Sequence, residues 1–468
     1  MGTKTYNAAT DMITFSRASG GTALRRVGYG TELADPSATY SLPAQYNGIS
    51  SAPAIGQTYR ISITRTTSGG GFTLSLGGSS SGWITFTGTR LFYLTTTNTN
   101  TLTIRGDGNT SGNAINVSVK QIIFDVATDP LVLFNHADNI PRIEYDAAGA
   151  VKGLLIEEQR VNLFTYSNDF TASSWQKVVT VTPNDAVSPD GTSNASRFPF
   201  SSSGYFQASL SRTVGQTYTV SAWVKSYDGT DEAFQLYGEN GGFSQNFVAT
   251  SEWQRFSFTY TATSSAGGYG DGIGRPTTNI PADLHVYGMQ LEAGGFPTSY
   301  IPTSGATATR AADVATIPTS AFGYNSGAGT VVVEASTNNV QSSLPHVWQL
   351  DAGSNSTRIV STFRETSGSV RMFIQNSGST DASLYRGSPL TSTTLVTSAG
   401  AWVTNNVAFS ADGSAPIADT NGCSIPNANT LRIGGVVSAG TTSLNGHIKS
   451  IQYYPRRLSN AQLQELTT

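Results

Sequence analysis

Six side chains in the middle of the chain have the chemistry of a sugar-binding surface. Pyranose rings need flat aromatic faces to stack on and planar polar groups to bond their hydroxyls. Within residues 218–225 an apolar row alternates with a polar row, and Trp223 stands in the polar row. The same alternation on neighbouring strands turns further aromatic and polar residues outward. The predicted carbohydrate-binding set is Trp223, Gln235, Tyr237, Arg255, His285 and Tyr287.

An alternative interpretation is that these outward residues are packed. A loop, a neighbouring domain or a sister subunit can cover an outward Trp or Tyr, and the sequence does not show that the strands are adjacent. Trp348, Tyr385, Trp402 and Tyr454 could also serve a sugar, although core packing explains most of them. In the first half of the chain the position that matches Trp223 is Thr64, so any site there must differ.

Several residues have side-chain oxygens that could act as ligands of a structural calcium ion. Carboxylate and amide oxygens are calcium ligands, but the same residues commonly form turns. The candidate ligands are Asn168, Asp169, Asp190 and Glu292. We expect no other cofactor.

Catalytic patterns are weak. Glu157 and Glu158, like Asp231 and Glu232, are adjacent and point to opposite faces of a strand. Glycoside hydrolysis needs two carboxyls about 5–10 Å apart across the substrate. The four His residues show no zinc spacing, and no phosphate loop or nucleophile motif occurs. We therefore expect that the chain is not an enzyme. A capsule depolymerase is the weakest of the alternative functions.

Composition predicts an all-β chain. Charged residues make up 12% of the 468 residues, and Gly, Ser and Thr are abundant, which suits short strands and turns better than surface helices. The net charge of −3 lacks the basic character of nucleic-acid binders. Because Cys423 is alone, no disulfide within the chain is possible. No apolar run is long enough for membrane insertion, and residues 1–15 lack a secretory signal, so we expect synthesis and folding in a cytoplasm.

A duplicated segment organises the chain. Residues 54–63 return at 213–222, with Gly-Gln-Thr-Tyr in common, and residues 115–122 match 284–291 less closely. Such repeats indicate related β-units. We predict several β-sandwich (jelly-roll) domains in series and one short C-terminal helix capped by Ser459. The predicted parts are a docking lead 1–34, a sandwich 35–128, a connector 129–163, a sandwich 164–302 and a third domain 311–468.

Three motifs carry a family resemblance. They are Ile13-Thr-Phe-Ser-Arg-Ala-Ser19, Pro141-Arg-Ile-Glu-Tyr-Asp146 and Gly153-Leu-Leu-Ile-Glu-Glu-Gln-Arg-Val-Asn-Leu163, and further matches lie at 290–294 and 299–303. Together they resemble phage and gene-transfer-agent head-spike or tail-fibre proteins. The first two motifs usually lie close together in that family, so the first repeat copy looks like an inserted domain. The copies are similar to carbohydrate-binding-module sandwiches, and the end of the chain is similar to concanavalin A or laminin-G-like jelly rolls.

The resemblance implies a role on a virion. A spike or fibre of this kind would bind capsular polysaccharide on the host cell and so promote particle attachment. It would act outside the cell, contact other spike or capsid proteins, and form a cyclic homo-oligomer. The alternative is a structural spacer, with recognition left to a partner protein.

Overall fold

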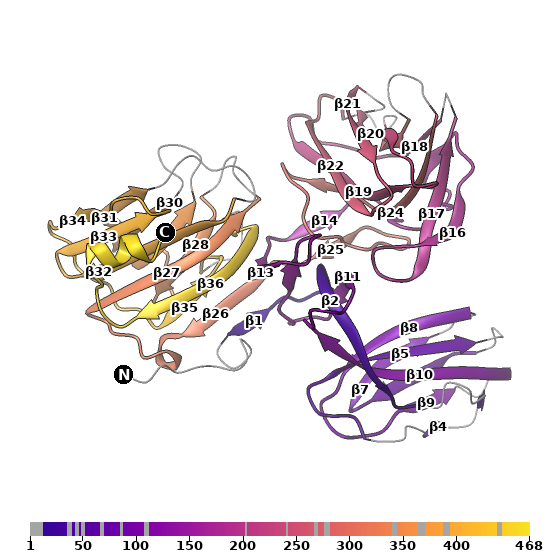
Figure 1. Cartoon of the computed structure of the whole chain (residues 1–468), viewed down its shortest axis with the longest axis horizontal. Coiled ribbons are helices and arrows are strands. Elements are labelled where there is room, and N and C mark those ends of the chain that lie inside the picture. Colours follow the sequence, from indigo (N-terminus) through magenta and orange to yellow (C-terminus); the bar gives the residue numbers. More distant parts are fainter. Residues whose placement is uncertain are drawn as a thin grey trace. The chain divides into compact units, whose positions relative to one another are not determined.

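The computed structural model confirms an all-β chain, with 56% of residues in strands and 3% in helices (Figure 1). It describes residues 13–34, 40–42, 46–47, 52–65, 70–84, 88–106, 112–201, 204–239, 242–265, 270–275, 281–338, 344–363, 370–386, 394–437 and 442–468. Residues 1–12, the first part of the predicted docking lead, lie outside this range. No helix among the described residues is long and apolar enough to span a membrane.

Two compact units divide the chain. One is Arg25–Val132, and the other combines Met1–Leu24 with Leu133–Thr468. The smaller unit therefore begins before residue 35, where the sequence placed its start, and ends after residue 128. The larger unit contains two sandwiches.

The first sandwich has two sheets, ordered β11-β2-β10-β5-β8, with β3 on β10, and β4-β9-β6-β7. Apolar residues from both sheets, such as Ile61, Leu74 and Val117, fill its core. Its strands are β2 (Gly21–Glu32), β3 (Tyr40–Leu42), β4 (Tyr46–Asn47), β5 (Thr58–Arg65), β6 (Phe72–Leu76), β7 (Ser79–Ile84), β8 (Gly88–Thr95), β9 (Thr103–Gly106), β10 (Gly112–Phe124) and β11 (Leu131–His136).

The second sandwich has two five-stranded sheets, ordered β15-β18-β23-β20-β21 and β16-β17-β24-β19-β22. Its core contains Tyr218, Val220, Ala222 and Val224, as the alternation predicted. Its strands are β15 (Gln176–Lys177), β16 (Thr182–Val187), β17 (Ser193–Phe200), β18 (Tyr205–Ser209), β19 (Thr217–Ser226), β20 (Glu232–Gly238), β21 (Phe243–Ala249), β22 (Gln254–Thr261), β23 (Gly270–Gly274) and β24 (Ala282–Ala293). A small ladder of β14 (Arg160–Asn162) with β25 (Ala308–Arg310) lies at its chain ends.

The duplicated segment forms the same structure twice. In the first copy β5 lies between β10 and β8, and in the second β19 lies between β24 and β22. The Tyr59 hydroxyl accepts the N–H of Ala54 at 2.8 Å, and the Tyr218 hydroxyl accepts the N–H of Thr213 at 2.9 Å. Local sequence therefore dictates both the strand and the turn that precedes it.

The third sandwich has two seven-stranded sheets, ordered β1-β26-β35-β28-β29-β30-β31 and β12-β13-β36-β27-β32-β33-β34. Its strands are β1 (Thr14–Ser16), β12 (Ile143–Tyr145), β13 (Val151–Ile156), β26 (Val314–Pro318), β27 (Ala328–Thr337), β28 (His346–Asp351), β29 (Arg358–Phe363), β30 (Val370–Asn376), β31 (Ser379–Arg386), β32 (Val396–Val403), β33 (Asn406–Ala411), β34 (Ile417–Asp419), β35 (Thr430–Ile433) and β36 (Gly446–Tyr454). A 3₁₀ turn, η3 (Thr319–Ala321), follows β26.

Two predicted segments have other roles in the structure. Residues 14–16 of the predicted lead are β1, which pairs with β26, and residues 21–32 belong to a sheet of the first sandwich. The predicted connector supplies β12 and β13, and β13 pairs with β36. Both segments contain strands that pair with strands of the sandwiches, so they are parts of the sandwiches rather than linkers.

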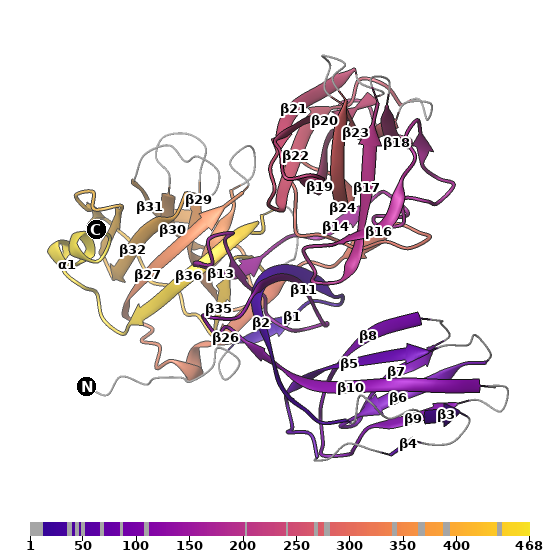
Figure 2. The ribbon, with the colours of Figure 1, turned by 45° about the vertical axis from the view of Figure 1, so that its right-hand side comes forward.

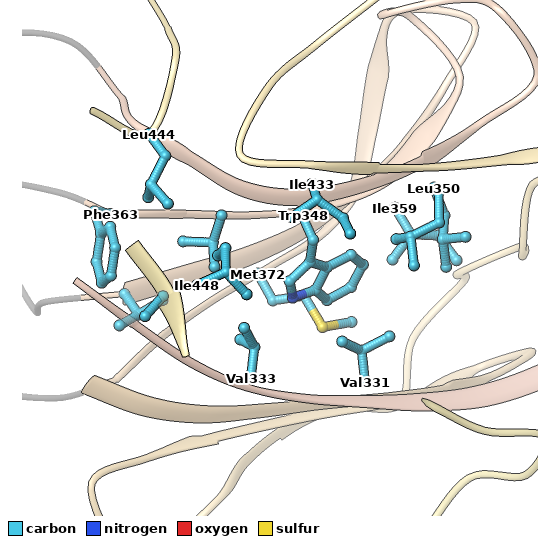
Figure 3. Close-up of a cluster of buried hydrophobic side chains, with 14 of the residues drawn as sticks. Val331, Val333, Trp348, Leu350, Ile359, Phe363, Met372, Ile433, Leu444 and Ile448 are labelled. Atoms are coloured by element: carbon cyan, nitrogen blue, oxygen red, sulfur yellow. The ribbon is translucent and has the colours of Figure 1, made fainter. Parts of the chain in front are cut away.

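A tryptophan-containing core joins the two sheets of the third sandwich. Trp348 and Trp402 are 1% and 0% exposed, as core packing predicted, and Trp348 lies among Val331, Met372 and Ile433 (Figure 3). The helix α1 (Asn460–Glu465) covers the outer side of β32 and β33 (Figure 2). Ser459 caps it through a reciprocal pair with Gln462, as the sequence predicted.

Candidate functional site

Four of the six predicted sugar-binding residues share one face of the second sandwich. Trp223 on β19 pairs with Arg255 on β22 and with Tyr287 on β24. His285 stands one row away, opposite Lys225. Strand alternation therefore correctly predicted that these side chains point away from the core.

This face is covered. Tyr287 and His285 are only 5% and 6% exposed. The Tyr287 ring lies 5.4 Å from the Tyr300 ring, and its hydroxyl donates to Asp190 at 2.9 Å. His285 Nε2 lies 2.8 Å from an Asp185 carboxylate oxygen. These residues have internal partners, so little of their surface is left for a ligand.

The segment 296–303 is a large part of the cover. Arg255 donates to the Thr298 carbonyl at 2.6 Å and to Ser221 Oγ at 3.0 Å. Trp223 packs, half-buried, in an apolar cluster with Leu133 and Tyr300. The packing alternative, rather than the open platform, therefore describes this face.

Gln235 and Tyr237 lie on the other sheet of the second sandwich, so the six residues do not form one surface. Both face outward beside β23, where Gly272 pairs with Tyr237 and Gly274 with Gln235. A Cβ at Gly272 would overlap the Phe206 carbonyl oxygen. The Tyr237 side chain lies beside these glycines, and its hydroxyl donates to the Phe206 carbonyl oxygen at 3.3 Å. The Tyr237 ring is buried and has no open face.

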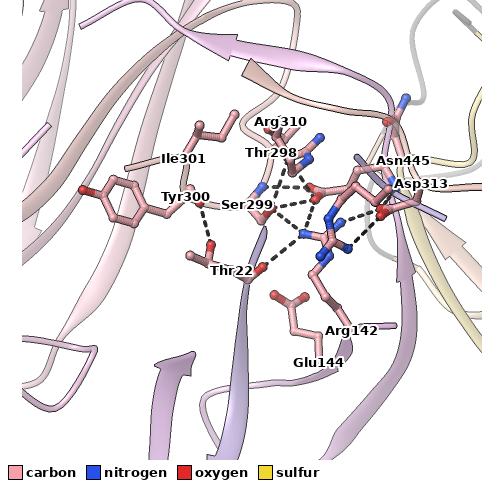
Figure 4. A network of polar contacts seen from close by, with 12 residues as sticks. Thr22, Arg142, Glu144, Thr298, Ser299, Tyr300, Ile301, Arg310, Asp313 and Asn445 are labelled. Atoms are coloured by element: carbon pink, nitrogen blue, oxygen red, sulfur yellow. Dashed lines mark hydrogen bonds and ion pairs between the residues drawn. The ribbon is translucent and has the colours of Figure 1, made fainter. Parts of the chain in front are cut away.

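The motifs that carry the family resemblance meet in a buried ionic junction (Figure 4). We use this name for Arg17, Arg142, Glu157, Ser299, Arg310 and Asp313. Asp313 accepts bonds from Arg17 at 3.1 Å and from Arg142 at 2.5 Å. Glu157 lies 2.8 Å from Arg142 and 3.0 Å from Arg310, and it accepts the N–H and hydroxyl of Ser299, each at 2.7 Å.

The ion pairs of the junction stabilise the charged form of Glu157. Burial by itself raises the pKa of the Glu157 carboxyl, but the charges of Arg310 and Arg142 outweigh it and hold that pKa well below its usual range. Such a carboxylate is a poor general acid. The sequence indicated the motifs but gave no sign that they converge, because they come from four distant segments.

The predicted calcium ligands have hydrogen-bond partners within the chain. The Asp169 carboxylate accepts bonds from Thr171, that of Asp190 from Thr192 and Asn194, and that of Glu292 from Thr298. The Asn168 amide donates to a backbone carbonyl. These hydrogen bonds stabilise turns and the covering segment, and the calcium site stays a prediction. Among the residues that the structure describes, no cluster of three or more His, Cys, Asp or Glu side chains could hold a metal ion.

The first sandwich has an open face that the sequence did not single out. We call it the tyrosine–arginine face and define it by Tyr29, Arg60, Tyr93 and Lys120. Arg60 on β5 pairs with Tyr93 on β8 and with Lys120 on β10. The Arg60 guanidinium lies 4.0 Å from the centre of the Tyr29 ring. Tyr29 and Tyr93 are 41% and 38% exposed.

The corresponding face of the second copy is packed. By strand pairing, the positions of Arg60, Tyr93 and Lys120 in the first copy are occupied in the second copy by Thr219, Thr259 and Glu292. Thr219 and Glu292 are fully buried, because Thr219 donates to the Gly294 carbonyl and Thr298 donates to Glu292. The same strand position is therefore packed in one copy and solvent-facing in the other. Applying the alternation test to residues 58–65 would have found Arg60.

A buried histidine makes the third sandwich sensitive to acid. The Nδ1–H of His346 donates to the Leu344 carbonyl at 2.9 Å, and its Nε2 faces Arg358 at 3.4 Å. Burial, and then the Arg358 charge, lower the pKa of His346 to about 4.

We expect acid to destabilise the fold through His346. The unfolded chain takes up the proton near pH 6.5 and the folded chain only near pH 4, so stability is complete above pH 6.5 and falls towards pH 4. The full loss is about 3 kcal/mol. Urea unfolding of wild type and His346→Gln at pH 7.5, 5.5 and 4.5 measures it. Identical pH dependence of the two proteins would contradict this assignment.

Comparison with known proteins gives only distant structural neighbours. No protein-family model and no curated protein matches the chain. One neighbour is the CBM22-1–GH10 part of xylanase Xyn10B from Clostridium thermocellum, complexed with xylohexaose, at 17% identity and a TM-score of 0.22. The match covers 31% of this chain and 30% of the xylanase chain, so this chain spans less than a third of that neighbour.

Two further neighbours contain tandem modules. The CBM22-1–CBM22-2 tandem of Paenibacillus barcinonensis Xyn10C is 11% identical over 58% of this chain and 94% of its own, with a TM-score of 0.21. Domains LG4–5 of the mouse laminin α1 chain are 12% identical over 68% and 96%, with the same TM-score. TM-scores this low describe no shared overall arrangement, and the function is therefore derived from the residues of this chain.

Proposed function

We propose that this chain is a non-enzymatic adhesin on the surface of a phage-like particle or gene transfer agent, and that it binds polysaccharide through the tyrosine–arginine face. One observation carries the proposal: two tyrosines, each about two-fifths exposed among the described residues, flank an arginine on one sheet face. Exposed aromatic rings on a flat polar surface suit the apolar faces of sugar rings.

Arginine completes the chemistry of such a site. The Arg60 guanidinium lies over the Tyr29 ring, 4.0 Å from its centre, and its N–H groups are donors of the kind that bond sugar hydroxyls. Lys120 and Ser62 add donors in the neighbouring positions of the same face. Tyr93 gives a second ring on the far side of Arg60, so successive sugar residues could contact both rings.

The tyrosines are expected to dominate binding. Replacing Tyr29 and Tyr93 together by Ala should weaken binding to a responding capsular polysaccharide about 10- to 100-fold, because truncated aromatic anchors typically cost 1–3 kcal/mol or more. Binding to an array of immobilised capsular polysaccharides, followed by titration of the responders, measures this effect.

A matched control is available in the second sandwich. Tyr227 is also 41% exposed and also lies under an arginine, Arg197, at 3.6 Å. Tyr227→Ala should leave binding unchanged. Equal losses in Tyr227→Ala and in the Tyr29/Tyr93 variant would count against the tyrosine–arginine face.

Display on a particle would convert weak sites into firm attachment. A cyclic homo-oligomer presents several copies, so millimolar sites could still hold a particle through multivalency. The proposed target is capsular polysaccharide of the host, and the proposed partners are other spike or capsid proteins. Particles should adsorb to capsulated cells and fail to adsorb to acapsular mutants.

A structural spacer is the second candidate function, and the buried ionic junction favours it. Its residues come from segments far apart in the chain and hold them together, which suits a rigid strut. Under this alternative, particles that carry the Tyr29/Tyr93 variant would adsorb normally, whereas the adhesin proposal requires a loss of adsorption.

A further inference from the structure

The third sandwich carries a second polar face, on the outer side of the sheet that contains β28 to β31. We call it the arginine face. Arg371 on β30 pairs with Tyr385 on β31, and Phe373 occupies the next row inward, opposite Val360. Arg358 on β29 stands on the other side of that row. The other residues of this face include Gln349, Asp351, Val360, Thr362, Gln375, Ser383 and Arg432.

Two guanidinium groups converge on one aromatic ring. The Cζ atoms of Arg371 and Arg358 lie 4.0 and 5.1 Å from the centre of the Phe373 ring. Arg371 also lies 5.3 Å from the Tyr385 ring, and its Nε donates to Ser383 Oγ at 3.0 Å. Phe373 is buried, while both arginines and Tyr385 are half-buried. The charged groups therefore lie fixed at the surface, over an apolar floor.

Neutral side chains hold Arg358 in place. It donates to Gln349 Oε1 at 2.8 Å and to Gln375 Oε1 at 2.9 Å. Both amides accept bonds without neutralising the charge. A guanidinium oriented in this way retains its electrostatic attraction for an anion.

Positive charge predominates among the described residues of this face. Asp351 is their one carboxylate, and it pairs with Arg432 at 2.8 Å. Three arginines against one aspartate leave a net charge of +2. Burial lowers the pKa of Arg358, the Asp351 charge raises it, and the Arg371 charge lowers it further.

We propose that the arginine face binds the oxyanion group of an acidic polysaccharide, a carboxylate or a sulfate ester, with Arg358 and Arg371 as donors and Tyr385 as a surface for the sugar ring. The site lies in a different sandwich from the tyrosine–arginine face and is independent of it. Its charge complements an oxyanion, and its aromatic residue complements a pyranose.

The charge pattern favours a polysaccharide over nucleic acid. The whole chain carries a net charge of −3, so it lacks the broad basic surface that nucleic-acid binding uses. A local site of two arginines beside a tyrosine instead matches one charged group on one sugar. Nucleic acid and anionic membranes are competing outcomes of the test.

Polymers that share one sugar backbone and differ only in charge test how much the arginines contribute to binding. The probes are dextran, carboxymethyl-dextran and dextran sulfate, each titrated against the full-length chain. Wild type should bind one or both charged polymers at least tenfold more tightly than dextran, and the response to each polymer distinguishes carboxylate from sulfate. The double variant Arg358→Gln/Arg371→Gln should lose that preference while its binding to dextran stays the same.

Controls keep the test decisive. Lys449→Gln removes one positive charge from the opposite sheet of the same sandwich, where Lys449 is 43% exposed, and should keep the preference. The Tyr29/Tyr93 variant should also keep it, so that this inference and the adhesin proposal fail separately. An unchanged preference in the arginine double variant would overturn the inference. So would equally tight, arginine-dependent binding to duplex DNA or to phosphatidylglycerol vesicles.

Discussion

Replacement of Asp313 by Ala should lower the free energy of unfolding of the larger unit by about 3–5 kcal/mol. Asp313 accepts bonds from Arg17 and Arg142, whose side chains are 0% exposed, and from the N–H of Glu157 at 2.9 Å. Without it, Arg17 loses its ion pair with Asp313, and Arg142 keeps its pair with Glu157, which Arg310 shares. A buried charge that loses its partner costs far more than an exposed pair contributes.

Urea unfolding at neutral pH measures this loss. Asp138→Ala is the matched control, because Asp138 is an exposed aspartate of the same unit. It should change the free energy of unfolding by less than about 0.5 kcal/mol. Asp313→Asn should also destabilise, since it keeps the shape and removes the charge. If Asp313→Asn unfolded like wild type, shape rather than ion pairing would hold the junction together.

Replacement of Trp348 by Ala should cost the third sandwich about 3–5 kcal/mol. Trp348 is 1% exposed, its ring lies 6.1 Å from that of Trp402, and apolar residues of both sheets surround it. The substitution removes a large apolar surface and leaves a cavity between the sheets. Interiors packed as densely as crystals fill such cavities only in part.

Thermal and urea unfolding of Trp348→Phe provide the comparison. Phe keeps most of the ring and leaves a smaller void, so its loss should be clearly less than that of Ala. Equal losses in the two variants would indicate that the ring as a whole contributes little and that only the indole edge matters.

Strand periodicity predicted more of the fold than of the site. It identified the inward residues of the second sandwich, such as Val220 and Leu284, because only one face of a strand can pack on the core. The Gly-Gln-Thr-Tyr repeat correctly indicated two copies of one framework, since its Tyr hydroxyl anchors the preceding turn in each. Ser459 indicated the single helix, because capping depends only on neighbouring residues.

Outward residues were less predictable, because their surroundings come from elsewhere in the chain. Trp223 and Tyr287 point outward as expected, yet Tyr300, which lies beyond the end of β24 at Ala293, packs against Tyr287. Arg60 carried the same sequence signal as the covered Thr219, and it is a candidate for binding because none of the described segments covers it as the segment after β24 covers Thr219.

By itself, then, the sequence determined what each strand buries, since that depends on a period of two and on nearby turns. Only the tertiary structure decided what covers the opposite faces. Arg17, Arg142, Glu157 and Asp313 are far apart in sequence and meet in one buried junction because charges removed from water must find partners. The same long-range packing left the tyrosine–arginine face open and gathered Arg358 and Arg371 over Phe373.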